Sequence, residues 1–125
     1  MTFVKICGLL ELEHVDVAVQ AGANFIGFVF APSKRQISVE KAQKLAAQLP
    51  AHVKKVGVFA NADMAHIKKV FTSVPLDYVQ YHGDETNSFI QTVGLPAIKA
   101  FSVREDTNFD EIATFDVDYY LTVSY

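Results

Sequence analysis

The stretch Tyr78-Val79-Gln80-Tyr81-His82 alternates two kinds of residue, and it decides between the folds open to this chain. On a β-strand, residues two apart point the same way, so Val79 and Tyr81 share one face while Gln80 and His82 share the other. In a barrel of parallel strands one face lines the lumen and the other meets the surrounding helices. The stretch therefore predicts a barrel strand with two polar groups at its mouth. Taken alone, Gln80 and His82 are better explained as a polar layer that bonds to itself or to water.

Outward from this stretch, short apolar runs alternate with segments of helical spacing. The predicted strands are Phe3–Cys7, Phe25–Phe30, Lys55–Phe59, Tyr78–Tyr81, Ala97–Phe101 and Val117–Val123. Several of them are apolar on both faces, as buried parallel strands are. The predicted helices run from Leu12 to Ala21, from Ser38 to before Pro50, from Asn61, from Asp84 to Gly94, and between Thr107 and Thr114, with Ser38, Asn61 and Asp84 in capping positions.

Strict alternation of strands and helices predicts an α/β protein with a parallel sheet. A TIM (β/α)8 barrel typically needs about 250 residues, so the 125 residues favour an open doubly wound sheet on length alone. No G-x-G-x-x-G follows a strand, which argues against a dinucleotide-binding version. Polar residues at the carboxyl ends of the predicted strands favour the barrel, which brings such ends to one mouth. These residues are Cys7, Arg35, Asn61, Gln80, His82, Ser102 and Arg104.

Composition indicates one soluble globular domain over residues 1–125. Half of the residues are apolar, 20% are charged, and the net charge is −3. This mild acidity argues against nucleic-acid binding. The single cysteine excludes an internal disulfide and favours a reducing cytoplasm. We expect no signal peptide and no membrane span, because the apolar runs are too short.

Cys7 and Arg35 are the two candidate site residues whose chemical roles are most specific. Cys7 ends a strand immediately before Gly8, where α/β proteins place reacting groups. A lone cysteine is more often a small buried apolar residue. Arg35 follows the second strand beside Lys34, and its plain interpretation is a solvated loop charge.

Several short motifs, in order along the chain, resemble those of the phosphoribosylanthranilate isomerase family. They are Lys5-Ile6-Cys7-Gly8-Leu9, Ala21-Gly22-Ala23, Gly27-Phe28-Val29-Phe30, Ser33-Lys34-Arg35, Val56-Gly57-Val58-Phe59, Val79-Gln80-Tyr81-His82-Gly83 and Ile98-Lys99-Ala100. The resemblance implies a TIM (β/α)8 barrel that acts in tryptophan biosynthesis. It implies an Amadori rearrangement of N-(5-phosphoribosyl)anthranilate to the 1-deoxyribulose 5-phosphate product, without metal or cofactor.

The resemblance also assigns roles to residues of this chain. Cys7 matches the family's general base, which removes the proton from C2′ of the Schiff base. Arg35 matches the arginine at the anthranilate carboxylate. Gln80 and His82 match substrate-binding residues of the mouth. The implied partner is a small phosphorylated substrate.

Two departures from the family pattern leave alternatives open. The family's general acid is an aspartate at the end of the sixth strand, where this chain has Thr122 and Val123; Asp116 and Asp118 lie at the start of that strand. Everything after the sixth strand is absent, including the phosphate loops. We therefore expect an incomplete barrel of six strands, truncated or incompletely recorded, with open edges that favour self-association.

Three alternatives to the isomerase follow. The chain is a non-catalytic half-barrel, an open-sheet protein with an unrelated thiol function, or another phosphate-handling barrel such as indole-glycerol-phosphate synthase. The last would need catalytic lysines and a glutamate at strand ends, which this chain does not place clearly.

Overall fold

The computed structural model describes residues 4–103 and 109–124 and contains six strands and five helices in strict alternation. Their bounds are β1 (Lys5–Cys7), α1 (Leu12–Gln20), β2 (Phe25–Val29), α2 (Val39–Ala46), β3 (Lys54–Phe59), α3 (Met64–Ser73), β4 (Tyr78–Tyr81), α4 (Asn87–Val93), β5 (Ala97–Val103), α5 (Phe109–Ile112) and β6 (Tyr119–Ser124). Every predicted strand is present, with ends shifted by a few residues.

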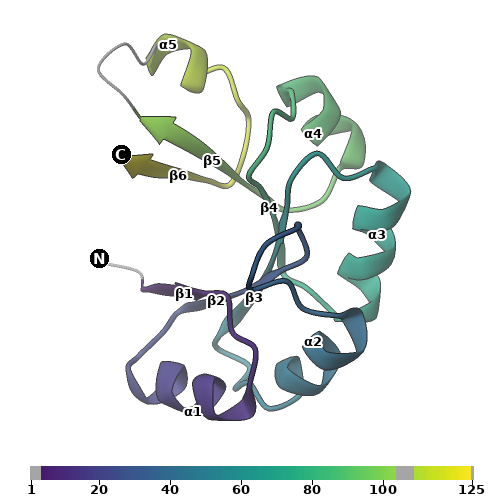
Figure 1. Cartoon of the computed structure of the whole chain (residues 1–125). Coiled ribbons are helices and arrows are strands. Elements are labelled where there is room, and N and C mark those ends of the chain that lie inside the picture. The colour runs from purple at the N-terminus through teal and green to yellow at the C-terminus, as the bar shows by residue number, and fades with distance from the viewer. Residues whose placement is uncertain (1–3, 104–108, 125) are drawn as a thin grey trace.

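The strands form one curved parallel sheet in the order β1-β2-β3-β4-β5-β6. Figure 1 shows the helices along the convex side of this sheet, with β1 and β6 at its two ends. Sequential order with helices on one side is the arrangement of a (β/α) barrel, whereas a doubly wound sheet carries helices on both faces. The predicted incomplete barrel is confirmed, and the open-sheet alternative is wrong.

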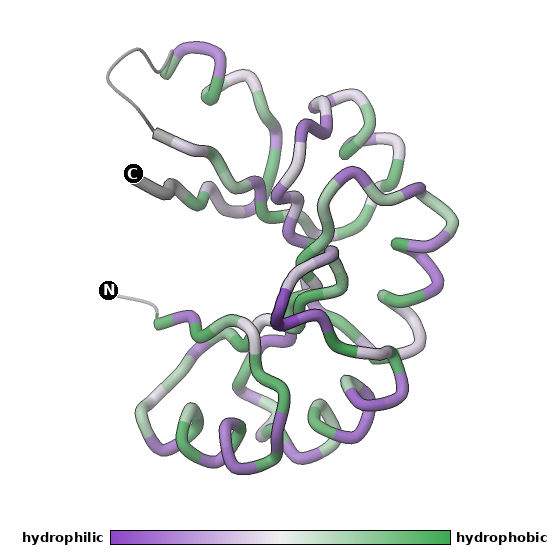
Figure 2. The backbone as a smooth tube through the Cα atoms, in the orientation of Figure 1, coloured by the Kyte–Doolittle hydropathy of each residue, from purple (hydrophilic) through white to green (hydrophobic). Residues whose placement is uncertain are grey.

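The two faces of the sheet carry two separate apolar cores. On the convex side Phe28, Val79 and Tyr81 pack with helix residues such as Ile67 and Ile90. The inner face carries a smaller cluster, formed by Phe25, Val56 and Ile98 with Tyr78 and Leu121 packed against it. Figure 2 shows polar and apolar residues alternating around the turns of α1 and α2, as expected for helices that bury one face.

Three aromatic side chains form a layer on the inner face, at the amino ends of the strands. Phe25, Tyr78 and Tyr119 contact one another, with ring centroids 5.5 to 5.9 Å apart. They come from β2, β4 and β6, and alternate strands are what fill a layer in such barrels. The three rings therefore connect strands that are not neighbours in the sheet, across its concave face.

The same reciprocal pair of hydrogen bonds joins consecutive strands in three places. In each, the residue before an even-numbered strand donates its backbone N–H to a carbonyl at the start of the preceding strand. Its side-chain oxygen accepts the N–H of that same residue. The three pairs are Asn24 with Val4, Asp77 with Lys55, and Asp118 with Ala97, at distances of 2.7 to 2.9 Å.

Two of the predicted helix caps are wrong, and the reason is local. The side chains that accept the first helical N–H groups are Asp63 for α3 and Thr86 for α4, rather than Asn61 and Asp84. Asn61 adopts a left-handed backbone, with φ of 55°, and its side chain bonds to the N–H of Asp84 instead.

The remaining helix ends follow the predictions. Ser38 caps α2, and Gly94 ends α4 in the left-handed conformation. The predicted start of the fifth helix at Thr107 lies outside the described residues. Within the described ranges, no helix is long and apolar enough to cross a membrane.

Candidate functional site

Cys7 lies at the carboxyl end of β1, directly beside Gly27 of β2 in the parallel register. Its thiol is partly exposed. A Cβ atom on residue 27 would lie 2.7 Å from the Cys7 sulfur, so no larger side chain fits there without displacing the thiol. Glycine at position 27 therefore makes room for Cys7 on the inner face. Sequence reasoning used Gly27 only as part of a motif and missed this role.

Arg35 reaches back from the loop after β2 to the end of β1. Its backbone N–H bonds to Ser33 Oγ at 3.0 Å, and its Nη1 donates to the carbonyl of Cys7 at 3.5 Å. The side chain passes over Gly8, where a Cβ would lie 2.5 Å from Arg35 Cδ. Gly8 has a φ of +84°, which strongly favours glycine. The structure thus brings together two residues that are 28 positions apart, and it leaves Arg35 exposed toward the mouth.

Lys5 is an inner-face cation that sequence reasoning did not single out. Its Nζ lies 3.3 Å from the same Cβ position on Gly27 that the Cys7 sulfur approaches. Lys5 also lines an inner cavity of about 290 Å³ with Phe25, Ile98 and residues of β6. The available signal was its spacing, because Lys5 and Cys7 are two apart on one strand.

Gln80 and His82 occupy β4 and the residue just beyond it. Gln80 is 2% exposed, and its Oε1 has no hydrogen-bond partner within the described part of the chain. His82 is exposed, and its backbone N–H continues the sheet by bonding to Phe59 at 2.8 Å. Among the described residues, no hydrogen bond or ion pair joins Gln80 or His82 to Cys7 or Arg35. These four residues lie at the same end of the barrel because each follows a strand or lies near its end.

The other strand-end residues have different positions. Asn61 connects the loops after β3 and β4 through Asp84, which is a structural contact. Ser102 is exposed near the end of β5. Arg104 lies outside the described residues. Residues 119–124 of β6 include no carboxylate, and Thr122 and Val123 pair with Phe101 and Ser102.

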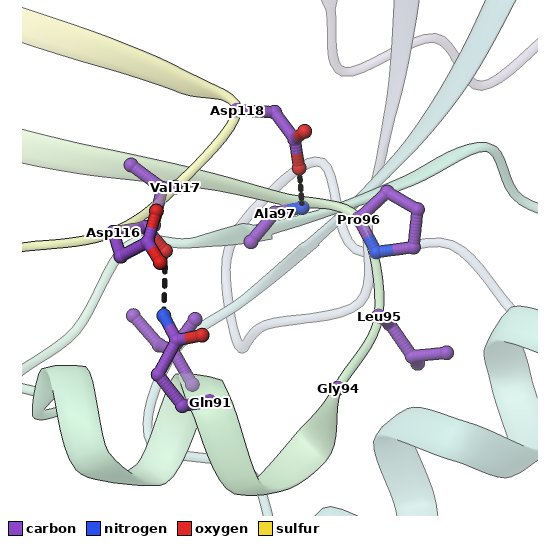
Figure 3. Close-up of a pocket in the computed structure, with 9 residues that line it drawn as sticks. Gln91, Gly94, Leu95, Pro96, Ala97, Asp116, Val117 and Asp118 are labelled. Atoms are coloured by element: carbon purple, nitrogen blue, oxygen red, sulfur yellow. Dashed lines mark hydrogen bonds between the residues drawn. The ribbon is translucent and has the colours of Figure 1, made fainter.

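Asp116 and Asp118 lie at the opposite end of the sheet, as the sequence predicts. A pocket of about 410 Å³ opens there between the end of α4 and the starts of β5 and β6. Figure 3 shows Asp118 bonded to the backbone of Ala97, and the Gln91 side chain bonded to the backbone oxygen of Asp116. Because this pocket lies at the amino ends of the strands, it is separate from the site around Cys7.

The chain matches a known family along most of its length. The family model for N-(5′-phosphoribosyl)anthranilate isomerase matches residues 4–123. The chain belongs to this family. An isomerase of that name from Streptococcus mutans is 47% identical over 121 residues, which are 97% of this chain and 61% of the relative. One from Listeria monocytogenes is 51% identical over 102 residues, which are 82% of this chain and 50% of the relative.

Solved structures of phosphoribosylanthranilate isomerases have the same fold. The enzyme from Thermotoga maritima matches all of this chain with 35% identity and a TM-score of 0.93, and the match covers 62% of that structure. A second isomerase structure, also 35% identical with a TM-score of 0.93, was solved with reduced 1-(o-carboxyphenylamino)-1-deoxyribulose 5-phosphate, and 66% of it is covered.

The chain therefore spans about 61% of the length of its first curated relative. These matches do not favour the alternatives of an indole-glycerol-phosphate synthase or a non-catalytic half-barrel.

Proposed function

We propose that the protein is an N-(5′-phosphoribosyl)anthranilate isomerase in which Cys7 is the general base and Arg35 binds the substrate carboxylate. The observation that carries the proposal is the junction of β1 and β2. There the Cys7 thiol lies over Gly27, and the Arg35 guanidinium crosses Gly8 to the Cys7 carbonyl. Both groups are accessible from the same end of the barrel, the end where such folds carry out chemistry.

The proposed reaction moves protons without adding or removing atoms. An acid protonates the ring oxygen of the ribose, the ring opens, and a Schiff base forms between C1′ and the anthranilate nitrogen. Cys7 as thiolate then takes the proton from C2′. The electron pair of that bond forms a C1′–C2′ double bond, while the π pair of the C1′–N bond moves to the nitrogen and gives an amine. The enol hydroxyl at C2′ then loses its proton and becomes the ketone as C1′ gains a proton. Positioned groups of this kind typically contribute about 10²–10⁴-fold to the rate.

Arg35 is suited to the anthranilate carboxylate because a planar guanidinium can bond both oxygens at once. Its contact with the backbone carbonyl of Cys7 holds the guanidinium at the end of β1, and this position sets the distance from the aromatic end of the substrate to C2′. Gln80 and His82 are proposed to bind the sugar. The unpartnered, buried Oε1 of Gln80 suits a hydroxyl donor.

The proposal also covers the location of the protein in the cell and its association with itself. A cytoplasmic location fits its single free cysteine. Self-association through β1 and β6 fits the sheet, because each of these strands has a neighbour on only one side within the described residues.

Replacing Cys7 by Ala tests the general base in the full-length protein. Wild type is expected to convert phosphoribosylanthranilate, with loss of the anthranilate-type fluorescence. Cys7→Ala is expected to lose about 10²–10⁴-fold in kcat with little change in KM, because the thiol acts in the proton transfer. A thermal melt of both proteins controls for folding. Unimpaired turnover in Cys7→Ala removes the base from this position, and an inactive wild type removes the proposed function.

A further inference from the structure

A buried ion pair lies behind the mouth, on the helix side of the sheet. Lys99 of β5 is 4% exposed and Glu85, in the loop after β4, is 7% exposed. Lys99 Nζ is 3.5 Å from Glu85 Oε1, and the ammonium lies over the rings of Phe101 and Phe115 at 5.5 and 6.0 Å. Charged residues are almost never fully buried unless they are paired. The groups that Lys99 and Glu85 contact therefore indicate what the pair does.

The ammonium of Lys99 contacts the backbone on both sides of His82. Its Nζ donates to the carbonyl of Gly83 at 2.7 Å and to the carbonyl of Tyr81 at 3.5 Å. The His82 N–H is itself held by Phe59 of β3 at 2.8 Å. The backbone N–H of His82 and the carbonyls of the residues on either side of it are therefore held, by β3 and by the ammonium of Lys99.

The carboxylate of Glu85 holds the same segment from the other side. Glu85 Oε1 accepts the N–H of Gly83 at 2.9 Å, and Oε2 accepts the N–H of Asn61 at 2.8 Å. Asn61 returns a bond through its Oδ1 to the N–H of Asp84 at 2.9 Å. The pair thus joins the loops after β3 and β4, with three buried or partly buried contacts to the backbone around Gly83. Such charge-assisted bonds are stronger than neutral ones.

We infer that Lys99 and Glu85 are positioning residues, which act through the backbone of residues 81–83 to fix His82 at the substrate mouth. This inference rests on the proposed function, since it assigns to the pair the geometry of one proposed substrate-binding residue. A pair that only stabilised the fold would need no contact with the two peptide groups that flank a mouth residue.

The test is a double-mutant cycle on the full-length protein. Lys99→Met and Glu85→Gln are made together, so that neither variant leaves a buried charge without its partner. We expect this paired variant to raise KM about tenfold in the wild-type background and less than about twofold in a His82→Ala background. In an Arg35→Ala background the full tenfold effect should return, because Arg35 is positioned by Gly8 and Ser33. Equal effects in all three backgrounds overturn the inference.

A second readout does not depend on turnover. Amide hydrogen exchange at His82 and Gly83 should become at least about tenfold faster in the paired variant, relative to the amides of α1. The matched control removes the exposed pair Lys41–Glu11 by Lys41→Met with Glu11→Gln, and it should leave His82 and Gly83 unchanged.

Unchanged exchange at His82 in the Lys99–Glu85 variant overturns the inference even if the wild type is inactive. If the protein is inactive and exchange does accelerate, the proposed function alone has failed.

Discussion

Tyr81 buries a hydroxyl for which the described part of the chain supplies no hydrogen-bond partner. The side chain is 0% exposed and packs edge-on against Phe89. Burial raises the pKa of Tyr81 to about 12, and the negative charge of Glu85 adds to this effect. An unpartnered buried hydroxyl costs stability, so the phenolic oxygen here is a weak point in an otherwise apolar layer.

We predict that Tyr81→Phe leaves stability at pH 7 unchanged or raises it by about 1 kcal/mol. The pH dependence of the unfolding free energy provides a second test of the buried hydroxyl. A pKa raised from 10.0 to about 12 means that the folded state holds its proton longer than the unfolded state. The wild type then loses stability as the pH rises from 10 toward 12, by about 2–3 kcal/mol from this group.

Urea melts of both proteins between pH 7 and pH 11 measure the effect. The difference in unfolding free energy should move in favour of Tyr81→Phe above pH 10. A constant difference across this range would show that folding does not raise the pKa of Tyr81.

At the scale of the element, we expect the reciprocal hydrogen bonds at the strand starts to contribute to the free energy of unfolding. We expect Asp118→Ala to lower the unfolding free energy by about 1.5–3 kcal/mol, because the Ala97 N–H loses a charged acceptor. Asp118→Asn should recover most of this loss, since Asn24 fills the same role at the start of β1 with an amide. Denaturant melts check both variants.

Asp116→Ala is the matched control for this prediction. Asp116 is exposed, and its contacts to Gln91 and Asn87 run through its backbone oxygen and nitrogen. Its replacement should change stability by less than about 0.5 kcal/mol. A loss equal to that of Asp118→Ala would show that acidity near this pocket, rather than the bond to Ala97, is what matters.

The sequence predicts the elements well because their signals are local. Period-two alternation in Tyr78–Tyr81, a serine before α2 and a glycine after α4 all act within a few residues. The predicted caps of α3 and α4 are wrong because Asn61 and Asp84 bond to each other across 23 positions. No local pattern reports such a pairing.

The same limit applies to the site. Residue parity predicts that Gln80 and His82 share a face, and position predicts that Cys7 ends a strand. Their roles in binding and catalysis stay predictions. The sequence does not predict the contacts of Lys99, because its partner Glu85 is 14 positions away and only the packing of β5 on the loop after β4 joins them. The signal that existed was a lysine inside an otherwise apolar strand.

At the scale of the whole molecule, the sheet has two open edges. We predict that the purified 125-residue chain self-associates in a concentration-dependent way, because unpaired strand edges are templates for pairing. Val4→Lys, next to β1 and 41% exposed, should weaken the association by placing a charge at one edge. Val17→Lys is the control and should not weaken the association, because Val17 lies on α1, away from both edges, and is 67% exposed.

Sedimentation velocity over a hundredfold range of concentration measures this prediction. A compact monomer throughout the range would show that the edges are protected, and equal weakening by both lysine variants would place the contact elsewhere.

The three reciprocal hydrogen-bond pairs also divide the chain into blocks, residues 4–46, 54–93 and 97–124, each of which contains both members of one pair. A chain broken between two blocks keeps every such pair within one polypeptide, whereas a break inside α1 or α3 puts the two members on separate pieces. For split-protein or permutation designs, new termini therefore belong in the segments that follow α2 or α4.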